Sequence, residues 1–579
     1  MKAVRAGQYG AYFLVFAAVC AAFAKTVGYP FVLWDDPQYI QNNPLVNPQI
    51  PWPPDGFLTA ELGYPIPVTV GLYRLVATLA GLQPWAFHAL NVLLHALNTT
   101  LLFALLCRLG TRRMALFGAL LWALHPLVVE PVTWCTGTKD LLYCCGFLLT
   151  IHAGLHRDRL PPWVLLVGLL TMLAKPTAIV LPAVLLWTVL ATEGLAGLKR
   201  PGLRLAVLLL GVLALGIFAV GLFLAQHAPV DGYGTVDDSA GSLLERVAGV
   251  LQALDLQMRH ALWPAGLLPQ YFRLTDLRPT DPPFWRGLLW LLALILLAIA
   301  VFRAQDRRLR LWLGLALIAY VPVSMLLPIK RFTCDSYAYV PLLCLVALAV
   351  SALENAVNSW QLRGELALVC SQLLGLTLQQ QPLWETSVRL WAVTVQVEPS
   401  QPLLIKRYAE SLDALGLRDD AFTYLQRNMG YLKRGLGVDG MVLAMFADRA
   451  PPEQARALYA WTYAHERNLL PDAHRNFCTF VVKQQLQLTQ TERQNLAQAL
   501  DVLRRYHARR GEVQALLALA GLGGQQQLWP ETAALLEHAW RLAGQQEHAE
   551  AAMVAYRNAG LLAEADRLQR ALSTVPPVR

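Results

Sequence analysis

Long apolar runs separated by short polar loops fill the chain up to about residue 380. A helix that spans a membrane needs about 20 predominantly apolar residues. The run 161–193 is too long for one span at about 1.5 Å per residue, and Lys175-Pro176 interrupts it, so it counts as two. The pattern predicts an all-α, polytopic membrane protein of about eleven transmembrane helices. The predicted spans are 9–27, 86–107, 113–129, 139–156, 161–174, 177–193, 203–225, 284–302, 309–327, 338–353 and 364–380.

Basic residues gather in alternate loops between these spans. The positive-inside rule assigns such loops to the cytoplasm, which predicts a cytoplasmic N-terminus and an extracytoplasmic C-terminal region. Membrane topology therefore accounts for the net charge of +9 without a nucleic-acid partner. The clusters are Lys2/Arg5, Arg108/Arg112/Arg113, Arg157/Arg159, Lys199/Arg200/Arg204 and Arg303/Arg307/Arg308/Arg310.

Composition agrees with a membrane protein, because only 15% of the 579 residues are charged and 56% are hydrophobic. A soluble domain carries roughly 25% charged residues. Two less apolar stretches, 66–82 and 243–262, are expected along the membrane surface, and the second has its charges on one face, as an interfacial helix does.

Beyond residue 380 the chain becomes charged, rich in Gln and helix-favouring. The segment GLLAEADRLQRA (560–571) echoes GLRDDAFTYLQR (416–427), with Gly, Leu, an acid and Ala at matching offsets. The irregular period predicts a degenerate, tetratricopeptide-like helical-repeat domain, a fold that usually presents a concave binding surface. We expect a transmembrane catalytic domain at 1–380 and a periplasmic repeat domain at 381–579.

Polar residues within the apolar part converge on the outer face of the predicted topology. The adjacent acids Asp35 and Asp36 follow the first span directly, where carboxylates are costly unless they bind or react with something. Acids mixed with cations near an interface suit a lipid-phosphate substrate, since cations hold the phosphate and a carboxylate takes a proton from an acceptor hydroxyl. The other members are His125, Glu130, Lys139, Asp140, Lys175, Arg259, His260, Lys330, Arg331, Asp335, Tyr337 and Tyr339.

Structural roles compete with this interpretation at several positions. One of the two adjacent acids could cap the surface helix, His125-Pro126 could end a helix, and Lys175 could snorkel to the surface. Among the nine cysteines, Cys135 and Cys334 fall in outer loops and could form a disulfide. The sequence contains no Cys, His and Asp cluster with the spacing of metal ligands, so no metal is expected.

Several blocks occur in an order that resembles a known family. They are FVLWDDPQYIQNNPLV (31–46), AFHALNVLLH (86–95), HPLVVEPVTWCTGTKDLL (125–142), AKPTAIVLP (174–182), HALWPAGLLPQYF (260–272), DSYAYVPLL (335–343) and LWETSVRLWAVTVQVEPSQP (383–402). In this order the blocks resemble the membrane-embedded GT-C glycosyltransferases joined to C-terminal tetratricopeptide repeats. That branch includes the transmembrane-and-tetratricopeptide O-mannosyltransferases and their bacterial relatives.

The resemblance implies a polyprenyl-phosphate-linked sugar as donor and an acid of the first outer loop as the catalytic base. It assigns this role to Asp35 or Asp36, with Asp36 slightly preferred. One position departs from the family, which usually has Asp-Arg-Tyr where this chain has Asp335-Ser336-Tyr337. Arg331 or Lys330 is the candidate replacement for the missing Arg.

These observations favour a glycosyltransferase of the bacterial inner membrane. It would move one sugar to an extracytoplasmic acceptor, such as a Ser or Thr of a pilin or another secreted protein held by the repeats. Transfer to a lipid or polysaccharide is an alternative, and the repeats argue mildly against it. A transporter would need inverted repeats of broken helices, which the sequence lacks. A scaffold whose repeats recruit partners would leave the acid pair without a role.

Overall fold

The computed structural model describes residues 2–50, 66–156, 159–227, 243–272, 281–326, 331–354, 360–434, 438–465, 469 and 471–574. These residues form helices and loops, with one isolated β-bridge between Tyr271 and Thr333. The all-α prediction is therefore confirmed. The chain divides into two compact units, Met1–Val397 and Glu398–Arg579.

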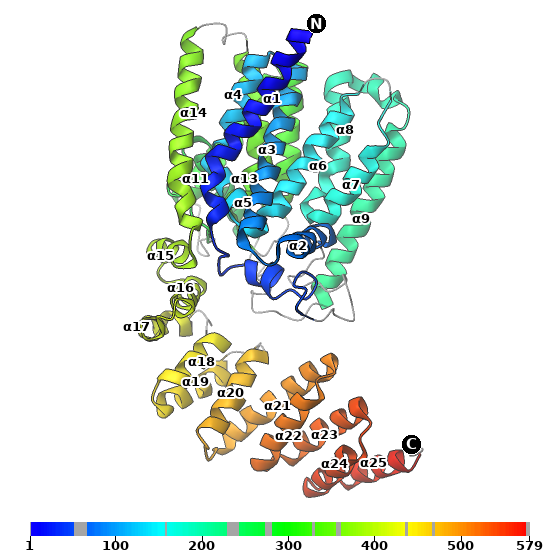
Figure 1. Cartoon of the computed structure of the whole chain (residues 1–579), viewed down its shortest axis with the longest axis vertical. Helices are drawn as coiled ribbons and strands as arrows, with labels where there is room; N and C mark the ends of the chain where they lie inside the picture. The colour runs from blue at the N-terminus through cyan, green and yellow to red at the C-terminus, as the bar shows by residue number, and fades with distance from the viewer. Residues whose placement is uncertain are drawn as a thin grey trace. The chain divides into compact units, whose positions relative to one another are not determined.

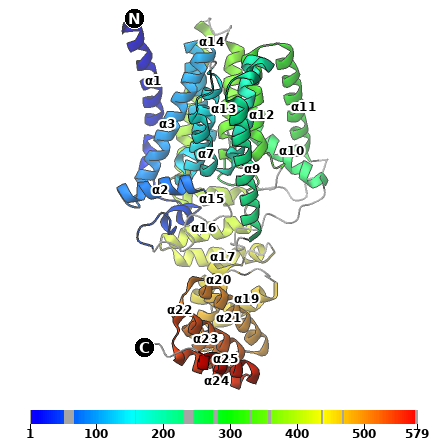
Figure 2. The ribbon, with the colours of Figure 1, turned by 90° about the vertical axis from the view of Figure 1, so that its right-hand side faces the viewer.

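A helix overlaps each stretch predicted to span the membrane. These helices are α1 (Lys2–Phe23), α3 (Pro84–Leu109), α4 (Arg112–Ala123), α6 (Thr138–Gly154), α7 (Trp163–Ala174), α8 (Leu181–Glu193), α9 (Leu203–His227), α11 (Pro282–Arg303), α12 (Arg307–Tyr320), α13 (Asp335–Leu353) and α14 (Trp360–Gln380). The two stretches predicted at the membrane surface form α2 (Pro67–Ala80) and α10 (Leu243–Leu262). Figures 1 and 2 show the long helices running side by side.

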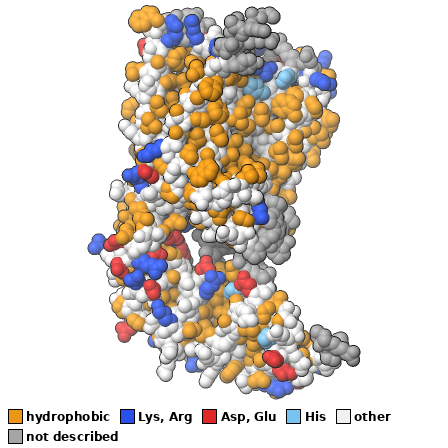
Figure 3. Space-filling model, viewed as in Figure 1, with side chains coloured by type: hydrophobic (Ala, Val, Ile, Leu, Met, Phe, Trp, Pro, Cys, Tyr) orange, Lys and Arg blue, Asp and Glu red, His pale blue; other side chains and the backbone are white. Residues whose placement is uncertain are grey.

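Six helices in the described part of the chain are long and apolar enough to cross a membrane, or seven if the bent pair Arg112–Ala123 and Pro126–Thr133 is one span. The count of about eleven stays a prediction. Hydrophobic side chains cover much of the flank of this unit (Figure 3). Burial distinguishes the helices at the centre of the bundle from those at its periphery. In α13, 61% of the apolar segment is buried, but in α11 only 11% is buried.

Small residues allow the helices to approach closely. A side chain at Gly146 on α6 would collide with Thr171 on α7, and one at Gly287 on α11 would meet the backbone of Leu251 on α10. Close backbone approach at such residues is typical of helix packing in membranes. The contacts fix α6 and α10, which both carry candidate site residues.

Irregular segments at one end of the bundle hold the candidate site. α4 ends before His125-Pro126, because proline disfavours a helical residue before it, and the chain bends by 59°. It continues through η4 (Pro126–Val128), α5 (Val129–Thr133) and η5 (Cys135–Gly137) into α6. The first loop contains a short π-helix, η2 (Pro37–Gln41). After α14 come η9 (Gln381–Trp384) and α15 (Ser387–Val397).

The second unit is a series of helices in which sequential neighbours pack together. The helices are α16 (Pro402–Ala414), α17 (Arg418–Arg434), α18 (Gly440–Arg449), α19 (Pro452–His465), α20 (Pro471–Lys483), α21 (Gln490–Arg510), α22 (Val513–Gln525), α23 (Trp529–Ala543), α24 (Gln546–Asn558) and α25 (Leu562–Thr574).

The two echoing segments of this unit form the same turn. Gly416 and Gly560 both adopt a left-handed backbone, with φ of 79° and 76°, which glycine tolerates without a steric penalty. The next residue donates its N–H back across the turn in each case, from Leu417 to the Leu412 carbonyl and from Leu561 to the Tyr556 carbonyl. The two similar sequence segments thus each contain the turn between one helix and the next.

The capping box at the start of α21 gives a stability prediction. Thr489 accepts a hydrogen bond from the N–H of Glu492, and the Glu492 carboxylate accepts one from the N–H of Thr489. Thr489→Ala removes half of this exchange and is expected to destabilise α21 by about 1 kcal/mol. Faster hydrogen exchange in the first turns of α21 would show the loss. Thr479→Ala, an exposed position within α20, is the control, and equal exchange in both variants would contradict the prediction.

Candidate active site

The two adjacent acids of the first loop occupy different environments. The side chain of Asp35 keeps 17% of its exposure, and its carboxylate lies 3.6 Å from the Lys139 ammonium. Asp36 is 1% exposed and accepts a hydrogen bond of 2.9 Å from the N–H of Val32. Burial, assisted by the charge of Asp35, raises the pKa of Asp36 to about 7. Asp35 is partly exposed and forms an ion pair with Lys139. Asp36 is buried and forms a hydrogen bond within its own loop.

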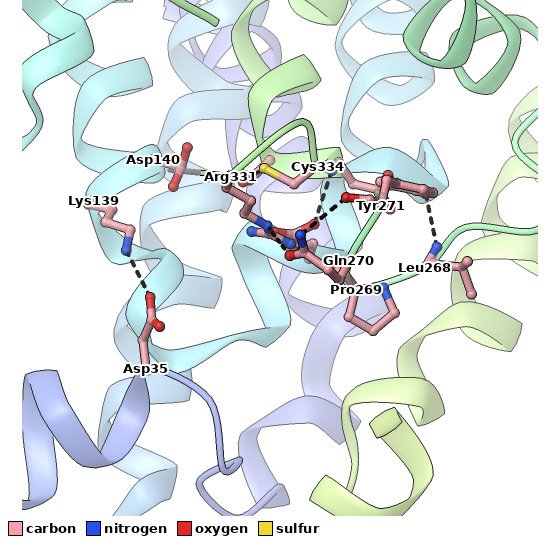
Figure 4. A network of polar contacts seen from close by, with 12 residues as sticks. Asp35, Lys139, Asp140, Leu268, Pro269, Gln270, Tyr271, Arg331 and Cys334 are labelled. Atoms are coloured by element: carbon pink, nitrogen blue, oxygen red, sulfur yellow. Dashed lines mark hydrogen bonds and ion pairs between the residues drawn. The ribbon is translucent and has the colours of Figure 1, made fainter. Parts of the chain in front are cut away.

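A run of alternating charges extends from Asp35 along the start of α6. Lys139 pairs with Asp35, and its neighbour Asp140 pairs with Lys175. The Lys139 ammonium also lies 4.7 Å from the centroid of the Tyr39 ring. Figure 4 shows Lys139 directed toward Asp35 and Asp140 directed away from it. Lys175 is mostly buried at the break between α7 and η6, so it does not extend to solvent.

Arg331 is the centre of a second group of polar contacts. Its guanidinium donates to Glu130 at 2.7 Å, to the Gln270 amide oxygen at 3.1 Å, and to the carbonyl of Pro269. The second Glu130 oxygen accepts the N–H of Asp335 at 3.1 Å. Glu130 is 1% exposed, and burying a carboxylate at this depth requires a paired cation. Arg331 supplies that cation.

Asp335 and its neighbours extend this group toward α10. The Tyr271 hydroxyl donates to Asp335 at 2.9 Å and lies 3.4 Å from His260 Nδ1. The sequence predicts His260 at the outer face, and in the structure its ring lies beside that of Tyr271. Figure 4 shows Gln270 and Tyr271 beside Arg331, which lies in the segment before α13.

Four tryptophans join the two groups of charges to α15. Trp34, directly before the acid pair, lies 5.0 Å from Trp134 and 5.0 Å from Trp391 and stacks on Trp384 at 6.1 Å, measured between ring centroids. The Arg331 guanidinium lies 4.4 Å from the Trp34 centroid, and Lys139 lies 5.2 Å from that of Trp134. Such cation–π contacts are worth about 0.5–2 kcal/mol each.

Two hydrogen bonds attach the first loop to α15. The N–H of Leu33 donates to Ser387 Oγ at 2.8 Å, and the carbonyl of Leu33 accepts from Trp391 Nε1 at 3.2 Å. The backbone N–H and carbonyl of Leu33 are therefore both hydrogen-bonded to side chains of α15. Leu33 is two positions before Asp35, and α15 follows the last predicted span. This anchoring fixes the position of the acid pair.

The structure brings most of the predicted site residues together. Asp35, Lys139, Asp140 and Lys175 form one group, with Lys175 lying 5.9 Å from the Tyr337 ring centroid. Glu130, Arg331 and Asp335 form the other. Asp36 lies beside the first group but faces Val32. Lys330 lies outside the described residues.

Three predicted residues lie apart from these contacts. His125 caps the start of η4 by accepting the N–H of Leu127 and contacts the carbonyl of Ala261, which is a structural role at the break after α4. Tyr339 is in the core, where its hydroxyl contacts His95 Nδ1 at 2.7 Å. Arg259 pairs with Asp255 on its own helix. Cys135 and Cys334 are both free thiols.

Sequence reasoning missed the uncharged part of the site. Gln270, Tyr271, Trp134 and Trp384 all lie inside the family-like blocks, but none was singled out for chemistry, because aromatic and amide residues near a membrane surface are common. Among the described residues, no group of three or more His, Cys, Asp or Glu is arranged to hold a metal ion. The site can accept a proton at Asp35 and stabilise an anion at Lys139 and Arg331.

Comparison with known proteins gives matches of limited extent. The chain is 34% identical over 152 residues to "Protein O-mannosyl-transferase TMTC1" of Mus musculus, covering 24% of this chain and 16% of that protein. It is 33% identical over 156 residues to TMTC1 of Homo sapiens, covering 24% and 17%. With TMTC3 of Mus musculus it shares 39% identity over 83 residues, covering 14% and 9%.

The homologues of this chain are thus proteins named as O-mannosyl-transferases. The alignments span about a sixth of the length of the two TMTC1 proteins. No protein-family model matches the chain, and no solved structure matches it significantly.

The attachment of the first loop to α15 can be tested by Trp391→Phe. Phenylalanine keeps most of the ring packing but leaves the carbonyl of Leu33 without its donor. An unsatisfied buried polar group costs about 1–3 kcal/mol, so we expect a lower melting temperature of the detergent-solubilised protein. Trp85→Phe, at a 53% exposed residue, is the control. Equal melting temperatures in the two variants would show that the loop does not depend on this bond.

Proposed function

We propose that this chain is a membrane glycosyltransferase that moves a sugar from a polyprenyl phosphate to the hydroxyl of a Ser or Thr in an extracytoplasmic protein. The observation that carries the proposal is the partly exposed carboxylate of Asp35, which lies beside the Lys139 ammonium at one end of the helix bundle. The homologues named protein O-mannosyl-transferases support both the transfer reaction and a protein acceptor, and they make mannose the first sugar to test.

Asp35 is the proposed general base. The sequence alone slightly favoured Asp36, but the burial of Asp36 and its hydrogen bond to Val32 suit a residue that holds the loop. Asp35 removes the proton from the acceptor hydroxyl as the hydroxyl oxygen attacks C1 of the sugar. The bond between C1 and the phosphate oxygen breaks, and its electron pair leaves with the phosphate.

Lys139 and Arg331 are the proposed phosphate ligands. Both already lie beside tryptophan rings and pair with acids. When Lys139 turns to the donor phosphate, it releases the Asp35 carboxylate that it neutralises in the free protein. Binding of the donor would thus raise the basicity of the group that must accept the proton. Fixed cations at the leaving phosphate also stabilise the charge that develops there.

The repeat unit is the proposed docking surface for the acceptor, a pilin or another secreted protein. Its paired helices resemble stacks that usually bind polypeptide. We place the protein in the bacterial inner membrane, with the N-terminus in the cytoplasm and the repeats in the periplasm. The alternation of basic loops supports this orientation. Protease added outside spheroplasts should degrade the repeat unit, and protection from it would overturn the topology.

Substitution of the two acids separates their roles. Asp35→Asn should lower transfer of mannose from polyprenyl-phosphate mannose to a Ser/Thr peptide by about 10²–10⁴-fold, because the amide cannot accept the proton. Asp36→Asn should keep most of the activity, because its side-chain oxygen can still accept the N–H of Val32. The reverse pattern would make Asp36 the base. Full activity in both variants would exclude either acid from catalysis.

The pKa of Asp36 predicts a pH dependence of stability. Its value of about 7 in the folded protein lies above the usual Asp pKa of about 3.9, so the folded state holds the proton that the unfolded state has lost between these pH values. This contribution therefore falls as pH rises through that range and levels off above pH 7. Asp36→Asn should be more stabilising at pH 8 than at pH 5 in thermal unfolding, whereas a pH-independent effect would contradict the assignment.

A further inference from the structure

A second cluster of charges lies between α10 and α11, apart from the candidate active site. The carboxylate of Asp255 accepts hydrogen bonds from Arg286 at 3.0–3.1 Å, from Arg259 Nε at 3.2 Å and from Trp290 Nε1 at 3.3 Å. Among the described residues, one carboxylate therefore serves two guanidinium groups. The cluster keeps one positive charge in excess.

Exposure differs sharply within this cluster. The side chain of Asp255 is 1% exposed, but those of Arg259 and Arg286 are each 43% exposed. The buried carboxylate of Asp255 thus holds the two arginines in place. Their guanidinium groups remain partly exposed at the protein surface. Because Gly287 lies against the backbone of Leu251, α10 and α11 are held in contact and the two arginines stay together.

The surroundings place these arginines at the headgroup level of a membrane. Arg286 is in the second turn of α11, which is strongly apolar and mostly exposed in this structure. Trp285 beside it is 53% exposed, and Leu262 and Trp263 at the end of α10 are 66% and 77% exposed. Tryptophan at the end of a membrane helix is typical of the interface. Figure 2 shows α10 lying across one end of α11.

We propose that Arg259 and Arg286 form a binding site for the phosphate of an anionic phospholipid. The two guanidiniums donate to the phosphodiester oxygens, a pairing that the planar Arg donors favour. Trp263 and Leu262 lie against the lipid near its glycerol and upper acyl chain. The excess positive charge selects a lipid with net negative charge over a zwitterionic one. This site is independent of the proposed transfer reaction, since none of the five hydrogen bonds to Asp255 involves Asp35, Lys139 or Arg331.

Native mass spectrometry of the full-length protein would test the site. The protein is equilibrated in mixed micelles with phosphatidylglycerol and phosphatidylcholine of identical acyl chains. Wild type should retain phosphatidylglycerol about tenfold more than phosphatidylcholine. D255N/R259Q/R286Q, which leaves no buried carboxylate unpaired, should retain the two lipids equally. R418Q/R475Q in the repeat unit, where both arginines are also exposed and paired with acids, should behave as wild type.

Two further measurements keep the test decisive. If the triple variant does not fold, R259Q alone leaves Arg286 paired with Asp255 and should lower the lipid preference about threefold. Inorganic phosphate at millimolar concentration should leave phosphatidylglycerol bound. Its displacement by phosphate would show a site for free phosphate and overturn the lipid assignment. Equal retention of both lipids by wild type, or an unchanged preference in the triple variant, would also overturn it.

Discussion

The ion pair between Arg331 and Glu130 is the contact on which the rest of the candidate site depends. It joins the segment before α13 to the short helix after the bend at Pro126, and Glu130 also holds the first N–H of α13. Loss of Arg331 would leave a carboxylate buried without a cation, a change that typically costs about 3–5 kcal/mol. The same guanidinium lies over Trp34, so the pair supports the first loop together with the hydrogen bonds from α15.

The four tryptophans connect the first loop to the segment that follows the last apolar helix, α14. Trp384 and Trp391 follow α14, yet they pack on Trp34 near the start of the chain. α15 therefore belongs to the unit that carries the acids, and the stacking compensates for placing a polar loop between apolar helices. Aromatic rings suit this position, because they cover part of the polar site with apolar surface while their faces attract the nearby cations. The result is a polar site with mostly apolar walls.

The sequence predicted the helices well because membrane spans depend on local composition, which runs of 20 residues express directly. The contacts between distant residues could not be predicted from local composition. Arg331 and Glu130 are 201 residues apart in the sequence, and Leu33 and Ser387 are 354 apart. The choice between Asp35 and Asp36 lay beyond the sequence for another reason. The two residues are identical and adjacent, and only the path of the loop decides which carboxylate turns inward to Val32. Likewise, Tyr339 carries the same family-like pattern as Tyr337 but turns into the core.

The first turn of α6 has a mechanical consequence. Lys139 and Asp140 are consecutive, and their partners lie on separate segments, the first loop and the break before η6. A rotation of this turn would therefore move both ion-paired side chains at once. A displacement of Asp35 is therefore transmitted through the backbone of α6 to Lys175. Occupation of the site at one edge would therefore change the ion pair at the opposite edge, so that the two segments respond together.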